Sequence, residues 1–140
     1  MQIFGIPEGE ARESPASDIR TLLIVDDEDA VVYAIREALA DPKYRVITTT
    51  DPAHALQILE TDGSVDLLIT DLFMPAMDGG TLLKKGRQLR PGLSAVLTTG
   101  AASGDQLKRW KARGEFIVAK PWLEGEFAAV VEKALKRRNG

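Results

Sequence analysis

Short runs of apolar residues recur along the sequence, and between them apolar residues return at every third or fourth position. The runs Thr21–Val25 and Leu67–Ile69 do not alternate with polar residues, which is typical of strands covered on both faces. Further strands are expected at about Arg45–Thr49, Ser94–Thr99 and Phe116–Ala119. The pattern therefore predicts a sheet whose central strands are fully buried.

The intervals between these strands have the apolar spacing of amphipathic helices. Asp51 followed by Pro52 is a good helix start, with the Asp as the cap and the Pro in the first turn. Gly86 lies within another interval, and because glycine weakens a helix by about 1 kcal/mol relative to alanine, it indicates close packing there. The expected helices cover about 31–39, 52–61, 81–90 (opened by Asp78 or Thr81), 104–113 and 127–138.

Strands and helices alternate five times, which predicts an α/β protein with one parallel sheet and helices on both of its faces. If the strand order is 2-1-3-4-5, the winding reverses between the first and third strands. The chain has 140 residues, which fits a single domain, expected at residues 19–140. Residues 1–18 are rich in Pro, Gly, Ser and acids and are expected to form a mobile extension.

The composition is that of an ordinary globular protein, with 44% hydrophobic and 28% charged residues. No stretch approaches the ~18 consecutive apolar residues of a membrane span, so we expect no membrane partner. The N-terminus lacks a basic start and a sustained apolar core, which excludes a secretory signal. The absence of cysteine excludes disulfides and thiolate chemistry. We expect a cytoplasmic protein.

Charge is distributed unevenly along the chain. Residues 1–83 carry 5 basic and 16 acidic residues, net −11, whereas residues 84–140 carry 13 basic and 5 acidic residues, net +8. The basic half could dock an acidic partner or nucleic acid, or its lysines and arginines could simply solvate amphipathic helices. No basic groove with interleaved aromatic residues accompanies these cations, so we expect no direct nucleic-acid binding.

Chemically reactive side chains follow four of the expected strands. Asp26 and Asp27 follow the first, Asp71 ends the third, Thr99 ends the fourth and Lys120 follows the fifth. In a parallel sheet these ends lie at one edge, and ligands bind there at the reversal of winding. Each residue alone has an ordinary structural explanation, as a cap, a strand former or a loop end. Their occurrence together at four strand ends favours a functional site.

Three clustered carboxylates repel one another unless a cation lies among them, and oxygen ligands of this kind suit Mg²⁺. With such an ion, the remaining residues fit phosphoryl transfer, which depends on positioning and charge neutralisation. Asp71 would attack phosphorus, Lys120 would pair with a phosphoryl oxygen and the Thr99 hydroxyl would donate a hydrogen bond to another. This pattern predicts an aspartyl phosphate at Asp71.

Four motifs together resemble those of response regulator receiver domains in two-component signalling. They are VDDE at 25–28, DLFMPAMDG at 71–79, TTG at 98–100 and KPW at 120–122, and the resemblance runs from about residue 21 to 138. The resemblance implies a flavodoxin-like (βα)5 fold and a phosphorylation-activated switch. It also implies that Asp26, Asp27, Asp71 and the backbone carbonyl of Phe73 contact the metal, and that Thr99 is the switch hydroxyl.

The same resemblance implies partners for this switch. A histidine kinase or a phosphotransfer protein would donate the phosphoryl group. An output protein would bind the face formed by the fourth and fifth expected helices. Such a receiver catalyses only its own phosphorylation and dephosphorylation, so it is not an enzyme acting on a separate substrate.

This sequence departs from the receiver pattern in three places. The aromatic residue common three positions before the lysine is replaced by Ile117, and Phe116 lies on the opposite face of the strand by alternation, so this chain departs from the aromatic-rotor pattern. The two positions that influence phosphate lifetime hold Phe73 and Ala101, and neither can orient a water. We therefore expect a long-lived phosphoryl group. Trp122 replaces the usual Phe, a tolerable apolar change.

Other functions remain open at this stage. An aspartyl-nucleophile phosphohydrolase of the haloacid dehalogenase kind needs an acid two residues after the nucleophile, where this chain has Phe73. A phosphate-independent docking module would not require the five strand-end residues. The chain could also be a receiver from a hybrid kinase or a longer regulator. The single histidine, His54, could relay phosphate in principle, but a surface role far from the active edge is expected.

Overall fold

The structure, a computed structural model, describes residues 18–100 and 103–139, and the side chains through residue 137. Its five strands form one parallel sheet in the order β2-β1-β3-β4-β5, which confirms the predicted order. Most of the expected extension and Ala101 lie outside the described residues. The strands are β1 (Arg20–Val25), β2 (Tyr44–Thr49), β3 (Val65–Asp71), β4 (Ser94–Thr99) and β5 (Phe116–Ala119).

Five helices follow the strands in turn: α1 (Asp29–Ala38), α2 (Pro52–Thr61), α3 (Gly79–Leu89), α4 (Gly104–Ala112) and α5 (Glu126–Asn139). Local chemistry begins three of them. The side chain of Asp51 accepts the Ala53 N–H at the start of α2, and that of Asp78 accepts the Thr81 N–H at the start of α3. Ser103 forms a capping box with Gln106 at the start of α4. Asp78 therefore opens α3, and the alternative start at Thr81 is wrong.

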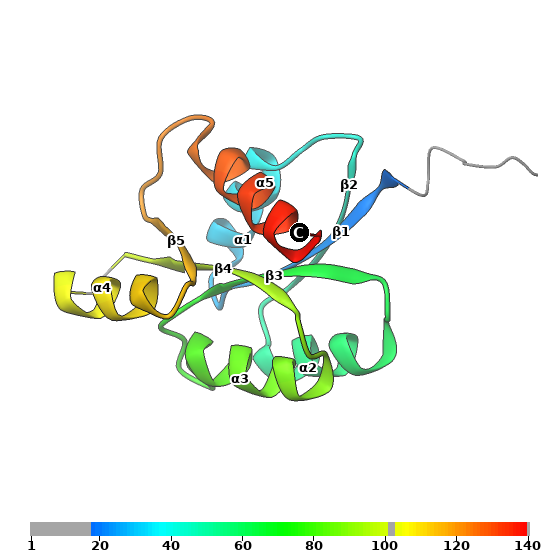
Figure 1. Cartoon of the computed structure of the whole chain (residues 1–140), viewed down its shortest axis with the longest axis horizontal. Helices are drawn as coiled ribbons and strands as arrows, with labels where there is room; N and C mark the ends of the chain where they lie inside the picture. The colour runs from blue at the N-terminus through cyan, green and yellow to red at the C-terminus, as the bar shows by residue number, and fades with distance from the viewer. Residues whose placement is uncertain (1–17, 101–102, 140) are drawn as a thin grey trace, which may run out of the picture.

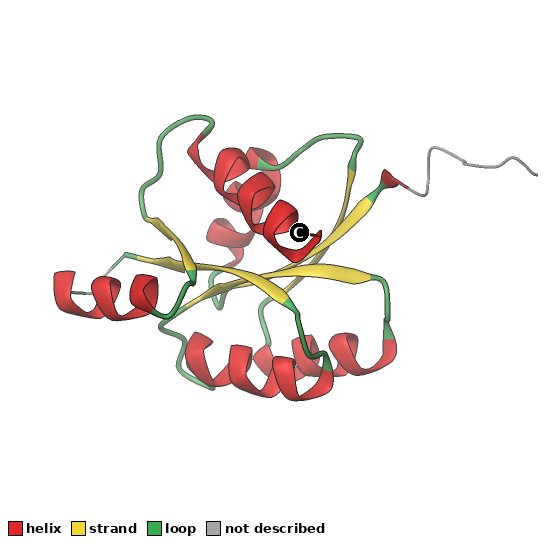
Figure 2. Cartoon of the chain, viewed as in Figure 1, coloured by secondary structure: helices red, strands yellow, loops and turns green. Residues whose placement is uncertain are grey.

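Helices cover both faces of the sheet, with α1 and α5 on one side and α2 and α3 on the other (Figures 1 and 2). Alternate residues of each central strand pack to opposite sides, as the pleat requires. Leu22, Leu67 and Val96 pack against α1 and α5, whereas Leu23 and Leu68 pack against α2 and α3. No helix in the described part of the chain is long and apolar enough to cross a membrane.

Two glycines of α3 allow its neighbours to pack closely. A Cβ at Gly86 would lie 3.1 Å from Cδ1 of Leu59 on α2, which confirms the close packing predicted there. A Cβ at Gly80 would lie 2.8 Å from the Trp110 ring on α4. Trp110 is half-buried and connects α4 to the hydrophobic cluster on the α2 and α3 side of the sheet. No residue of α4 is fully buried. The fourth helix is therefore attached much less extensively than the other four.

Candidate functional site

The carboxyl edge of the sheet brings the predicted lysine and two of the predicted acids into direct contact. The Lys120 ammonium donates to Oδ2 of Asp26 and to Oδ2 of Asp71, each at 2.9 Å. β1 and β3 are neighbours because the winding reverses between them, and β5 lies two strands away from β3. The long lysine side chain therefore spans β4 to reach both carboxylates.

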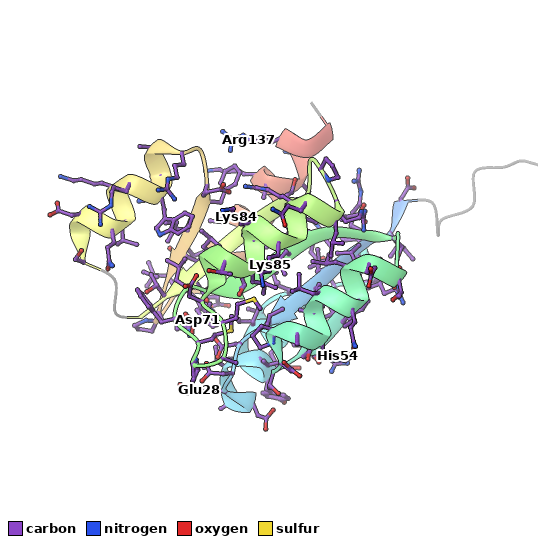
Figure 3. The ribbon with its side chains drawn as sticks, turned by 90° about the horizontal axis from the view of Figure 1, so that it is seen from below. Glu28, His54, Asp71, Lys84, Lys85 and Arg137 are labelled. Carbon is purple, nitrogen blue, oxygen red and sulfur yellow. The ribbon has the colours of Figure 1, made fainter. Side chains whose placement is uncertain are left out.

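Asp27 completes an acidic cluster at this edge. One carboxylate oxygen from each of Asp26, Asp27 and Asp71 lies within 4.8 Å of the others. Asp26 is fully buried and Asp71 nearly so, whereas Asp27 is exposed. In Figure 3, Asp71 and Glu28 are labelled at the same end of the molecule. An oxygen-only donor set open to solvent on one side suits a small hard cation that keeps several waters.

Burial and ion pairing act against each other at Asp26. Burial raises the pKa of its carboxyl group above the ordinary value of 3.8, although hydrogen bonds from Lys120 and from the Glu28 N–H partly oppose the rise. Burial would by itself lower the pKa of Lys120, but its hydrogen bonds to the two carboxylates outweigh burial and raise the pKa above 10.5. The lysine is thus held firmly in its charged form beside a desolvated acid.

The loop after Asp71 is held by hydrogen bonds from its backbone N–H groups. Oδ1 of Asp71 accepts the Phe73 N–H at 3.0 Å, and the Gly79 N–H donates to the carbonyl oxygen of Leu72 at 2.9 Å. A Cβ at Gly79 would lie 2.1 Å from the Asp71 carbonyl oxygen, so only glycine fits there. Asp78 next to it caps α3. The MDG part of the motif thus closes the loop and starts the following helix.

Thr99 is the last residue of β4 and is buried at the same edge. By strand alternation it belongs to the same side of β4 as Leu97, whose cluster lies under α2 and α3. Its carbonyl oxygen accepts the Lys120 N–H at 2.8 Å, which ties the ends of β4 and β5 together. The predicted role of Thr99 toward phosphate and that of the Phe73 carbonyl toward a metal stay predictions.

The alternation of Phe116 and Ile117 on β5 is as predicted. Phe116 packs on the α1 and α5 side, where the Arg137 guanidinium lies 4.9 Å from its ring centre. Ile117 packs on the opposite side, in the same cluster as Trp110. The position at which the resemblance implies an aromatic residue is therefore aliphatic here, and it packs against the same cluster as Trp110 of α4.

His54 is exposed, as predicted, but it is not remote from the active edge. Its Nδ1 lies 3.0 Å from Oγ1 of Thr49, the last residue of β2. The carbonyl oxygen of Thr49 in turn accepts the Asp26 N–H at 3.4 Å. The expectation of a distant surface residue was wrong because α2 begins at the same edge of the sheet at which the strands end.

Two features of the site were absent from the sequence-based prediction. Lys120 was assigned to a phosphoryl oxygen alone, yet its ammonium already bridges Asp26 and Asp71. Thr98 was passed over, although its buried Oγ1 has no hydrogen-bond partner among the described residues. The β4 alternation could have revealed Thr98, since it places this residue on the same side of the sheet as Asp71.

The fold and this edge together define a doubly wound α/β domain with an acid–lysine cluster at its switch point. Residues 22–132 match the family described as the response regulator receiver domain. This chain belongs to that family. Receiver domains of response regulators are signalling modules of two-component systems that interact with histidine kinases and output domains.

Curated relatives share about a third of the aligned residues. The chain is 32% identical over 121 residues to the sensor kinase CckA of Brucella abortus, covering 85% of this chain and 13% of that protein. It is 33% identical over 116 residues to the DNA-binding transcriptional regulator NtrC of Azospirillum brasilense, covering 82% and 24%. The chain thus spans less than two thirds of the length of these relatives, and their whole activities are not carried over.

Solved structures have the same fold. A signal receiver domain of an HD domain-containing protein from Pseudomonas fluorescens Pf-5 matches with a TM-score of 0.76 and 28% identity, covering 86% of this chain and 98% of that one. A CheY-like receiver domain from Methanospirillum hungatei JF-1 matches with a TM-score of 0.76 and 25% identity, covering 86% and 97%. These matches confirm the predicted flavodoxin-like arrangement.

Proposed function

We propose that this chain is a phosphorylation-activated switch whose phosphoacceptor is Asp71. The observation that carries the proposal is the bridge from the Lys120 ammonium to both Asp26 and Asp71, with Asp27 beside them. A nucleophilic carboxylate, a fixed cation and an acidic metal cluster are the parts that phosphoryl transfer to an aspartate requires.

In the proposed reaction, a carboxylate oxygen of Asp71 attacks the phosphorus of a phosphohistidine. An O–P bond forms, the N–P bond breaks, and its electron pair returns to the imidazole of the donor. Lys120 then turns from the Asp71 carboxylate toward a phosphoryl oxygen, while Thr99 donates its hydroxyl hydrogen to another. The donor would be a histidine kinase or a phosphotransfer protein.

Asp26, Asp27, Asp71 and the carbonyl oxygen of Phe73 would hold Mg²⁺ at this edge. The clustered carboxylate oxygens fit this ion by their chemistry and by their spacing within 4.8 Å. When bound, the ion supplies positive charge that offsets the charge of the transferred phosphoryl group. Asp26 and Asp71 retain Lys120 as a partner in its absence, which explains how the buried acids are tolerated.

The output surface of the proposed switch is the face formed by α4, β5 and α5. This face carries exposed cations, among them Arg113 over the Trp110 ring and Arg137 over the Phe116 ring. Its charge supports an acidic partner surface. Because α4 has no fully buried residue, its position can change at small energetic cost.

The phosphoryl group of this chain is proposed to be long-lived. Phe73 is two residues after Asp71, is 48% exposed, and has no polar group with which to orient an attacking water. Ala101, the other position invoked in this prediction, lies outside the described residues. We expect slow loss of phosphate from the purified phosphoprotein and faster loss in Phe73→Asn. Rapid loss that is unchanged in Phe73→Asn would contradict the proposal.

Phosphorylation by acetyl phosphate tests the function directly. We expect intact-mass analysis to detect one added phosphoryl group in the presence of Mg²⁺, none in Asp71→Ala, and none after chelation. The absence of Mg²⁺-dependent phosphorylation would instead favour a docking module that does not read phosphate. Steady release of phosphate from acyl phosphates would favour a phosphohydrolase, which Phe73 argues against.

The partner and the protein context require a second experiment. A pull-down from the source cells would compare beryllofluoride-treated protein with Asp71→Ala and would name any partner that reads the phosphorylated state. If the native protein has a much larger mass in cell extracts, the chain is a receiver within a hybrid kinase or a longer regulator.

A further inference from the structure

Thr98 carries a fully buried hydroxyl close to Asp71. Its exposed fraction is 0%, and its Oγ1 is the one buried side-chain oxygen or nitrogen without a hydrogen-bond partner in the part of the chain that the structure describes. Buried hydroxyls are costly without a partner and are nearly always satisfied in folded proteins. A valine would fill the same space without a buried polar group, so packing alone does not explain why a threonine occupies this position.

The register of the sheet places Thr98 next to Asp71. The two residues are paired in the β3–β4 ladder, and paired residues of parallel strands direct their side chains to the same side. Val96 and Val118, which bracket Thr98 on that side, belong to the cluster under α1 and α5. Asp71 and Thr98 are therefore side-chain neighbours on this side of the sheet.

The side chain of Lys120 runs across the end of β4. It starts after β5 and reaches carboxylates of β3 and β1, so it has to pass the strand between them. A Cβ added at Gly100 would lie 3.6 Å from Cβ and 3.8 Å from Cδ of Lys120, which locates this crossing at the end of β4. Thr98 is two residues before Gly100, near the end of β4, and thus lies below the Lys120 side chain.

We propose that Thr98 is a positioning residue for the phosphorylated form of Asp71. Lys120 now occupies Oδ2 of Asp71. When its ammonium turns to a phosphoryl oxygen, the Thr98 O–H donates to the oxygen that the lysine leaves. Rotation about the Cα–Cβ bond moves Oγ1 among three staggered positions, so the backbone need not move. No proton is transferred, and one hydrogen bond to Asp71 replaces another. The inference rests on the proposed phosphorylation of Asp71.

If the Thr98 hydroxyl forms a hydrogen bond only in the phosphorylated state, its removal should affect the phosphorylated and unphosphorylated states differently. Thr98→Val removes the hydroxyl and keeps the shape. Before phosphorylation it removes a buried group without a partner, so the melting temperature should be equal to or above that of the wild type. In the phosphorylated state it removes a donor to Asp71. A purely structural role for Thr98 would change both states in the same direction.

Beryllofluoride with saturating Mg²⁺ serves as the phosphoryl probe for this test, with binding to the full chain measured by titration. We expect the dissociation constant to rise about tenfold in Thr98→Val, which corresponds to one lost hydrogen bond, and to stay near the wild-type value in Thr98→Ser. Thr21→Val is the matched control because Thr21 is a buried β1 threonine at the opposite edge. It should leave the dissociation constant unchanged.

Equal beryllofluoride affinity in Thr98→Val and wild type would overturn the inference, as would an equal loss in Thr98→Ser. If the valine variant does not fold, Thr98→Ser and Thr98→Ala, which differ by one hydroxyl, make the same comparison. If the wild type is phosphorylated by acetyl phosphate while the Thr98 variants bind normally, the inference alone fails. If the wild type neither binds beryllofluoride nor accepts phosphate, the proposed function fails and the inference fails with it.

Discussion

Two lysine–carboxylate ion pairs of almost equal length lie at opposite edges of the sheet. Lys120 contacts Asp26 at 2.9 Å at the carboxyl edge, where Asp26 is fully buried. Lys43 contacts Glu132 at 2.8 Å beside the amino end of β2, where both side chains are 48% exposed. The pKa of Asp26 is raised because burial dominates, whereas the pKa of Glu132 is lowered by the hydrogen bond from Lys43. Distance alone therefore does not describe an ion pair.

This difference in burial shows at which edge of the sheet the loss of a charged partner has a large effect. At the carboxyl edge, Lys120 compensates two carboxylates that water does not solvate well, so removal of the lysine leaves both carboxylates without a cation in a poorly solvated place. At the amino edge, water replaces a lost partner. A site that binds and releases anionic groups belongs at the first kind of edge, because each added charge there has a large effect.

The largest expected effect tests the buried pair. Lys120→Met keeps the length of the side chain but leaves Asp26 and Asp71 without their cation. We expect a loss of about 4 kcal/mol in the free energy of unfolding at neutral pH, since breaking a buried pair leaves an uncompensated charge. Urea unfolding in the absence of divalent ions measures it. A loss no larger than that in Lys43→Met would remove the distinction between the edges.

Glycine substitution extends the comparison from charge to space. Gly79→Ala would place a Cβ 2.1 Å from the Asp71 carbonyl oxygen, and we expect it to cost about 3 kcal/mol in unfolding free energy. Gly63 precedes β3 at the amino edge and has no atom within 4 Å of its virtual Cβ. The same change at Gly63 is the matched control and should leave stability nearly unchanged. Similar melting temperatures for the two variants would contradict the close approach at Gly79.

The pH dependence of stability should differ in sign at the two edges. The raised pKa of Asp26 means that the folded state binds this proton more tightly than the unfolded chain. Its contribution is fully present below pH 3.8 and is lost as the pH rises through the raised pKa. Asp26→Asn should abolish that fall, so the variant should be more stable than the wild type at pH 7. Denaturation between pH 4 and pH 8 measures it, and a destabilised Asn variant would contradict it.

The smallest expected effect is at the exposed pair. Lys43→Met removes a solvated cation beside Glu132, and exposed pairs usually contribute little. We expect a melting temperature equal to that of the wild type within error, at low and at high salt alike. A clear loss at low salt that disappears at high salt would show that the amino edge also depends on its ion pair.

Most of the fold was predictable because it follows from local patterns. Runs of apolar residues that do not alternate with polar ones predicted the buried strands. β4 and β5 have the predicted bounds, and Asp51 caps α2 as expected. Strand ends then placed Asp26, Asp71 and Lys120 at one edge through the topology alone. The prediction that these side chains meet needed only the rule that parallel strands end together.

The remaining features depend on distances across the fold. That Lys120 reaches past β4 to bridge two acids depends on side-chain length and strand spacing together, which no local pattern contains. The 2.1 Å limit at Gly79 arises from the backbone of Asp71 on another element. The position of His54 was mispredicted because α2 begins at the carboxyl edge of the sheet, where β2 has just ended.

The close contact between Gly80 on α3 and Trp110 on α4 limits which residues can occupy these two positions together. Since a Cβ at residue 80 would lie 2.8 Å from the indole, a large residue at one position requires a small one at the other. Related chains with a smaller residue at the position of Trp110 are free to carry a side chain at the position of Gly80. The two positions should therefore vary together across relatives, and the glycine records the size of its neighbour rather than a need of its own backbone.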